Sequence, residues 1–256
     1  MLQHHRDRRR AHSFGEDPET YHRERPSYPR ALIDELMAGE PHRVLDVGCG
    51  TGKAGSLLAA RGCTVLGVEP DERMAAVARR HGLEVELAKF EEWDPAGRRF
   101  DLVVSGQAWH WVDPAGGARA AAAALRRGGR LAVFGNRSTY DPETQAAIDE
   151  VYGRLAPQML EESGSPVIPR SDPYPLHADA IAAGGHFHPE RSFTYPWTQE
   201  YPRERWLELL STHSNHRVLP DAERAALFAA VGDVVDRLGG SIRLEYHTVL
   251  SCWTRR

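Results

Sequence analysis

An acidic residue and three alternate glycines lie close together in the stretch 44–55, VLDVGCGTGKAG. Gly48, Gly50 and Gly52 lack the Cβ atoms that hold a ligand away from the backbone, so an adenosine-bearing ligand can lie against this turn. Asp46, which comes just before the glycines, would repel a phosphate group and attract a positive charge. The residue types and their spacing therefore predict a site for a cationic, adenosine-bearing ligand.

Two other kinds of nucleotide site use similar glycine turns. A P-loop needs a glycine at position 47 and a serine or threonine after its lysine, whereas this chain has Val47 and Ala54, so triphosphate binding is not expected. The stretch 50–55 does satisfy the dinucleotide pattern G-x-G-x-x-G, and Glu69 lies where an acid would bind a ribose hydroxyl. Asp46 disfavours a pyrophosphate at this position, but an NAD-dependent oxidoreductase remains an alternative.

A second stretch with chemical potential is 100–114, FDLVVSGQAWHWVDP. Its apolar start predicts a buried parallel strand, and the turn after that strand lies at the carboxyl edge of the sheet, where ligands bind in open α/β folds. His110 is the titratable side chain of this turn, and an imidazole can accept a proton near neutral pH. We predict His110 as the catalytic residue. The alternative is a packed aromatic cluster in which Trp109 and Trp111 flank it.

Alternating strands and helices must position these residues. Strands are predicted at 44–47, 65–69, 83–87, 100–104, 130–135, 191–198 and 242–253, and helices at 30–36, from 54 onward, and at 73–81, 115–127, 202–210 and 221–238. This alternation is typical of a parallel sheet. Residues 1–14 are predicted to be a disordered arm and 21–29 an irregular stretch. The proline-rich segment 136–189 predicts short helical pieces that form a cap, or a disordered loop.

Two of the motifs resemble those of a known family. VLDVGCGTG and VLGVEPDERM are similar, at the expected spacing, to the first and second motifs of the class I S-adenosylmethionine (SAM)-dependent methyltransferases. The pattern Y-x-x-x-R-P-x-Y-P, which begins at Tyr21, resembles the N-terminal segment that folds over SAM in the subgroup that includes trans-aconitate methyltransferase-like proteins. Lys89 departs from the family, whose members often have an acid at this position.

The resemblance implies roles for individual residues. In the family the glycine turn contacts the methionine and ribose, the second-strand acid binds the ribose hydroxyls, and residues after the third strand flank the adenine. The implied SAM contacts are Tyr21, Arg25, Asp46, Gly48, Cys49, Gly50, Thr51, Glu69, Pro70, Met74, Phe90, Glu91, Ser105, Gln107 and Trp109. Tyr21 or Tyr28 would stack against the sulfonium, or the segment would be a packed N-terminal helix with these rings as anchors. The turn that holds His110 would face the transferable methyl.

The implied fold is an α/β, Rossmann-like doubly wound seven-strand sheet whose last strand is antiparallel. It divides into an arm and flap (1–30), a SAM-binding core (31–136), an inserted substrate cap (137–189) and a segment that completes the sheet (190–256). The implied reaction is transfer of the SAM methyl group to an oxygen, nitrogen or carbon nucleophile of a small molecule. A SAM-binding protein without methyl transfer, such as a cyclase or a regulatory module, is the other alternative.

Composition favours a single catalytic domain over other classes of protein. The 256 residues are 41% hydrophobic, enough for a full core, and the net charge of −4 gives no sign of nucleic acid or an anionic membrane as partner. Without an apolar run of signal-peptide or membrane-spanning length, we expect a cytoplasmic protein. The histidine pairs 186/188 and 213/216 lack nearby ligands, so no metal site is expected. The oligomeric state is left open.

Overall fold

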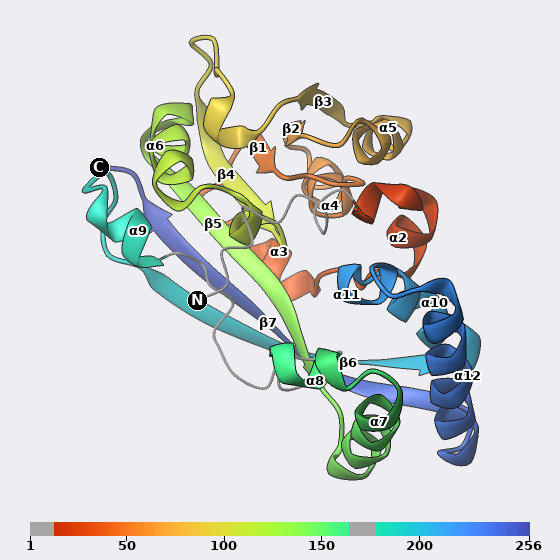
Figure 1. The fold of residues 1–256 in the computed structure, drawn as a ribbon. Coiled ribbons are helices and arrows are strands. Elements are labelled where there is room, and N and C mark those ends of the chain that lie inside the picture. The colour runs from red at the N-terminus through yellow and green to blue at the C-terminus, as the bar shows by residue number, and fades with distance from the viewer. Residues whose placement is uncertain (1–12, 164–177) are drawn as a thin grey trace.

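The computed structural model describes residues 13–163 and 178–256 and arranges their strands in one mixed sheet (Figure 1). The strands are β1 (Arg43–Val47), β2 (Thr64–Glu69), β3 (Glu84–Leu87), β4 (Phe100–Gly106), β5 (Leu125–Thr139), β6 (Arg191–Pro202) and β7 (Ser241–Thr254). Their order is β3-β2-β1-β4-β5-β7-β6, and β7 runs antiparallel to both of its neighbours. The predicted Rossmann-like seven-strand sheet with an antiparallel last strand is confirmed.

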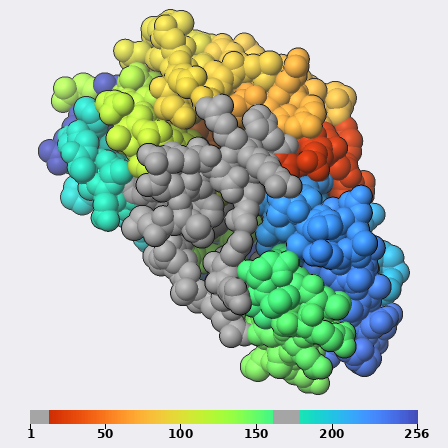
Figure 2. All heavy atoms as spheres, in the orientation of Figure 1, coloured from red at the N-terminus to blue at the C-terminus, as the bar shows by residue number. Residues whose placement is uncertain are grey.

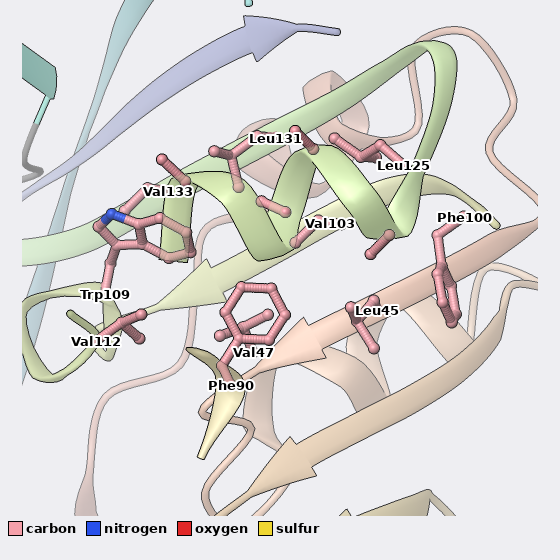
Figure 3. Close-up of a cluster of buried hydrophobic side chains, with 14 of the residues drawn as sticks. Leu45, Val47, Phe90, Phe100, Val103, Trp109, Val112, Leu125, Leu131 and Val133 are labelled. Carbon is pink, nitrogen blue, oxygen red and sulfur yellow. The ribbon is translucent and has the colours of Figure 1, made fainter. Parts of the chain in front are cut away.

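Helices cover both faces of the parallel part of the sheet, because its strands are apolar on both sides. α3 (Arg30–Leu36), α4 (Lys53–Ala59) and α5 (Glu72–Arg80) contribute to the hydrophobic cluster on one face. α6 (Pro114–Ala124) and α9 (Ala178–Ala183) contribute to the cluster on the other. Figure 3 shows part of this second cluster, with Trp109 and Phe90 packed over β1, β4 and β5.

The long strands β5, β6 and β7 carry a third hydrophobic cluster beyond the parallel part of the sheet. It is built with α7 (Pro142–Leu155), α8 (Pro157–Ser163), α10 (Arg203–Ser211) and α12 (Asp221–Arg237). Figure 2 shows the green surface of α7 and α8 beside the blue surface of α10 and α12, away from the yellow and orange surface of the parallel half. One continuous sheet therefore supports two separately packed ends.

The N-terminal segment is more ordered than the sequence predicts. Phe14 belongs to η2 (Phe14–Glu16), and the stretch expected to be irregular begins inside α2 (Pro18–Glu24). This helix starts with a proline in its first turn, and the Asp17 side chain accepts a hydrogen bond of 3.1 Å from the backbone N–H of Thr20. An aspartate cap and a proline in the first turn are typical of a helix start. The prediction of an irregular stretch, which rested on the prolines of 21–29, did not use them. The rest of the predicted disordered arm, 1–12, lies outside the described residues.

The boundary between α6 and β5 also differs from the prediction. The helix ends at Ala124 instead of residue 127, because Leu125 already pairs with Phe100 of β4. At its other end β5 continues to Thr139, since each residue there has a partner on β7. The boundary expected between core and cap at position 136 therefore falls inside a paired strand.

Candidate active site

A cavity of about 530 Å³ opens at the carboxyl ends of β1, β2 and β4, the edge where ligands bind in this kind of sheet. Fourteen of the sixteen predicted site residues line it: Tyr21, Arg25, Asp46, Gly48, Cys49, Gly50, Thr51, Glu69, Pro70, Met74, Phe90, Glu91, Gln107 and His110. Ser105 and Trp109 do not. The cavity size is that of an ordinary small-molecule site.

The floor of the cavity is the glycine turn between β1 and α4. Gly48 and Gly50 have positive φ angles of 63° and 55°, a backbone conformation that favours glycine. A Cβ atom on Gly48 would lie 2.6 Å from the Cβ of Ala108, so the turn after β1 and the turn after β4 touch at this point. Glycine therefore allows the two turns to meet and leaves the backbone open to a ligand.

Two buried carboxyl groups border this turn. Glu69, at the end of β2, accepts hydrogen bonds from the backbone N–H groups of Gly50 (2.9 Å) and Asp71 (3.0 Å). Asp46, in β1, accepts one from Gly55 (2.9 Å). Burial raises the pKa of both groups to about 7, and the Glu69 charge adds to the effect on Asp46. A cation in the cavity would favour their ionised forms.

An apolar slot lies beyond Glu69. It is lined by the side chains of Met74, Leu87 and Phe90, of which Met74 and Phe90 are buried and Leu87 is 47% exposed. Glu91 lines the same region from η3 (Phe90–Glu92), while the Lys89 ammonium donates a 2.9 Å hydrogen bond to Glu92. These apolar side chains suit contact with a flat apolar ring.

Aromatic rings from three segments close another side of the cavity. Phe14 packs edge-to-face against Tyr21 of α2 and against Trp111, with both pairs of ring centroids 5.8 Å apart. The Arg25 guanidinium lies over the Tyr21 ring at 5.2 Å and donates a 2.8 Å hydrogen bond to the carbonyl of Thr212. Sequence analysis missed Phe14, because its site partners lie in other segments and no local pattern marks it.

Ion pairs fix α2 in this position. The Glu24 carboxylate is almost fully buried and accepts from Arg23 (2.6 Å) and from Arg205 of α10 (3.1 Å). The Lys53 ammonium, at the start of α4, donates a 2.6 Å hydrogen bond to the carbonyl of His22. Burial lowers the pKa of Lys53 to about 8. The N-terminal segment is thus anchored both to the glycine-turn helix and to α10.

The turn after β4 brings His110 to the cavity but turns two other predicted residues away. Trp109 is 1% exposed and packs in the core beside Phe90, as Figure 3 shows. Ser105 is fully buried, and its hydroxyl donates a 3.0 Å hydrogen bond to the carbonyl of Val47. Neither side chain lines the cavity, so their predicted cofactor contacts stay predictions without support from this geometry. Gln107 lines the cavity and donates from its side chain to the carbonyl of Asn136 (3.3 Å).

The histidines near α11 (Ser214–Arg217) form a buried polar cluster. The Nε2 atom of His216 lies 2.6 Å from the Tyr152 hydroxyl, and its Nδ1 lies 3.0 Å from the side-chain oxygen of Asn215. Burial lowers the pKa of His216 to about 3, and the Arg25 charge adds to this, so the ring stays neutral. Among residues 13–163 and 178–256, no group of three or more His, Cys, Asp or Glu residues is arranged to hold a metal ion.

The segment predicted to cap the substrate does not line the cavity where the structure describes it. All described lining residues fall between Phe14 and Val112. α7 and α8 pack with α10 and α12, whereas α9 packs beside α6. Residues 164–177 of the predicted cap lie outside the described part of the chain. Within that part, none of the helices is both long and apolar enough to cross a membrane.

Comparisons with known proteins agree with this geometry. A family model for the methyltransferase domain matches residues 21–168. An uncharacterised methyltransferase of Mycobacterium tuberculosis is 39% identical over 144 residues, which cover 56% of this chain and only 59% of that protein. The trans-aconitate 2-methyltransferase of Mycolicibacterium gilvum is 26% identical over 207 residues, covering 78% of this chain and 79% of the relative.

Solved structures show the same fold. A protein described as a type II methyltransferase from Anaeromyxobacter dehalogenans aligns with a TM-score of 0.63 at 24% identity, over 89% of this chain and 97% of its own. The YcgJ protein of Bacillus subtilis aligns with a TM-score of 0.54 at 17% identity, over 96% and 99%. Since the family model covers more than half of the sequence, the chain belongs to the methyltransferase domain family.

Proposed function

We propose that this protein transfers the methyl group of SAM to an oxygen, nitrogen or carbon nucleophile of a small molecule. The observation that carries the proposal is the pair of buried carboxyl groups, Asp46 and Glu69, on either side of an open glycine turn. Because burial raises their pKa values, ionising these two groups costs free energy. A cationic ligand beside them offsets that cost by attracting the two negative charges. SAM carries such a charge next to an adenosine.

The residues present fit an adenosyl ligand. Each Glu69 oxygen accepts one backbone N–H and keeps a lone pair, so the carboxylate can accept two further donors, such as a pair of ribose hydroxyls. Gly48 and Gly50 present backbone to the cavity without Cβ atoms. The apolar slot at Met74 and Phe90 suits an adenine ring.

When bound, SAM supplies a methyl group on a cationic sulfonium that a nucleophile can displace. The rings of Tyr21, Phe14 and Trp111 offer their faces and edges to this charge and exclude water from it. Asp46 adds a compensating negative charge. His110 is proposed to accept a proton from the acceptor, or to orient an acceptor that is already ionised.

A small carboxylic acid is the first acceptor class to test. One relative bears the name trans-aconitate 2-methyltransferase, and the cavity contains the positive charge of Arg25. A guanidinium is suited to hold a carboxylate, either of the acceptor or of the methionine part of SAM. The chain shares only part of its length with the relatives above, so the acceptor of a relative need not be its own. Phenols and amines therefore complete the acceptor panel.

The proposal is tested by calorimetric titration with SAM, followed by detection of S-adenosylhomocysteine after incubation with the acceptor panel. We expect SAM to bind, and Glu69→Ala to weaken binding at least about tenfold because charge-assisted hydrogen bonds are lost. Glu72→Ala, three residues away in α5, is the matched control and should bind normally. Binding of NADH without SAM would overturn the proposal. Binding of SAM without turnover on any acceptor would instead indicate a binding protein.

A further inference from the structure

A chain of side-chain hydrogen bonds runs across three strands toward the active-site turn. The indole N–H of Trp197, on β6, donates to the hydroxyl of Thr248, on β7, at 2.8 Å. The Thr248 hydroxyl in turn donates to the side-chain oxygen of Asn136, on β5, at 2.7 Å. Thr248 is fully buried, and it lies directly opposite Asn136 in the strand register.

The direction of these bonds is fixed by chemistry. An indole N–H can only donate, so the Thr248 hydroxyl accepts from Trp197, and a backbone carbonyl can only accept, so the Asn136 NH₂ group must face Ser27. The side-chain oxygen of Asn136 is therefore the atom that faces Thr248, and its NH₂ group faces the opposite way. There it donates a 2.9 Å hydrogen bond to the backbone carbonyl of Ser27.

Asn136 connects this series of hydrogen bonds to two parts of the cavity wall. Ser27 immediately precedes Tyr28, which lines the cavity from the N-terminal segment. The backbone carbonyl of Asn136 accepts from the side chain of Gln107, which lines the cavity from the turn after β4. One residue thus holds the N-terminal segment and the turn of His110 in register with each other.

Gln107 needs such support because its backbone is in an unusual conformation. Its φ angle is 59°, in the left-handed region that residues with a Cβ rarely adopt. Its backbone N–H donates to the backbone carbonyl of Phe134 (2.8 Å), and its side chain donates to that of Asn136. Both hydrogen bonds therefore connect Gln107 to β5. Such a conformation at the edge of a cavity is retained where the surrounding structure enforces it. It sets the path along which Ala108 meets Gly48 and His110 reaches the cavity.

We infer that Thr248 is a positioning residue for methyl transfer, acting through the Asn136 side chain on the Ser27–Tyr28 segment, which lines the cavity at Tyr28. It does not line the cavity, so it has no contact with cofactor or acceptor. The catalytic part of this inference rests on the proposed function, whereas the structural part does not. Without the Thr248 hydroxyl, the Asn136 amide keeps only its bond to Ser27, so the connection to the Ser27–Tyr28 segment loosens, whereas the bond from Gln107 to the Asn136 backbone carbonyl remains.

The test uses the full chain and the nearly isosteric variant Thr248→Val, with Thr248→Ser as the conservative variant that keeps the hydroxyl. Ser251→Ala is the matched control, since it removes one side-chain hydrogen bond (to Ser192, 3.2 Å) from a buried residue of the same strand. Amide hydrogen exchange is measured over 27–28, with 107–111 as the comparison segment that the Asn136 backbone holds. We expect faster exchange over 27–28 for Thr248→Val only. Unchanged exchange there, or an equal change in Ser251→Ala, would overturn the inference.

The second readout is turnover with SAM and an acceptor from the panel above. For Thr248→Val we expect kcat to fall about tenfold, with SAM affinity within about twofold of wild type and recovery in Thr248→Ser, as a small misplacement of reacting groups predicts. Trp197→Phe, which removes the donor but leaves the hydroxyl, should give a smaller loss. A normal kcat in Thr248→Val would refute the positioning role. If the wild type binds no SAM, the proposed function fails, and the exchange data still decide the structural part.

Discussion

Replacing Asp46 by asparagine should stabilise the protein while it weakens the ligand site. In the folded protein without a ligand, burial raises the pKa of this carboxyl group from 3.8 to about 7. A carboxyl group with a raised pKa prefers to be protonated in the folded state, so its contribution to stability is lost as the pH rises from about 4 to 7. Asparagine resembles the protonated acid and can still accept the hydrogen bond from Gly55.

The size of the effect follows from the shift. Asp46 is 1% exposed, so solvent screening does not reduce it, and about three pH units correspond to about 4 kcal/mol of unfolding free energy at pH 8. At pH 5 the solution is only about one pH unit above the pKa of the carboxyl group in the unfolded protein. The gain in unfolding free energy from Asp46→Asn therefore falls below about 2 kcal/mol. Urea unfolding of cofactor-free wild type and Asp46→Asn at both pH values measures the difference. Equal stability of the two proteins at pH 8 would refute the reasoning.

Asp101 supplies a control of opposite sign. Burial alone would raise the pKa of this carboxyl group, but the backbone N–H groups of Arg43 and His42 and the Arg126 guanidinium outweigh burial and lower it. Its stabilising effect is present above the unfolded pKa and is lost as the pH falls through the folded one. Asp101→Asn should therefore destabilise the protein at pH 8. Two aspartate-to-asparagine changes in neighbouring strands would then have opposite effects, which a general effect of charge removal does not produce.

Three further outcomes are expected. SAM affinity should increase as the pH rises from 6 to 8, because a cation binds the ionised forms of Asp46 and Glu69, whose pKa values are about 7. A dissociation constant that calorimetry finds to be the same at pH 6 and pH 8 would contradict this. Phe14→Ala should weaken SAM binding about three- to tenfold through lost ring contacts, whereas Phe193→Ala, on β6, should not. His110→Gln should lower kcat about a hundredfold for an acceptor that must lose a proton, or raise KM for a carboxylate. A variant with unchanged kcat and KM would exclude His110 from the reaction.

The features that could be predicted from the sequence are those encoded within one contiguous stretch. The glycine turn, the acid at the end of β2 and the apolar strands each have a local pattern, and the parallel sheet follows from their alternation. Phe14 has no such pattern, because its role depends on contact with Trp111, almost a hundred residues away. The same holds for Asn136, which the sequence places at the start of a cap. Only pairing with Thr248 on β7 shows that it belongs to a strand beside the site.

The residues after β4 show how a single backbone conformation decides which side chains meet the ligand. Strand alternation ends at Gln107, whose left-handed conformation leads into η4 (Trp109–Trp111). In such a 3₁₀ turn successive side chains point about a third of a turn apart, so neighbours face different surroundings. Trp109 enters the core, while His110 and Trp111 line the cavity. The sequence WHW identifies the turn as a site candidate, but it does not contain the φ angle of Gln107, which depends on β5. That dependence is why His110 reaches the cavity only when the backbone of β5 holds the turn, through the carbonyls of Phe134 and Asn136.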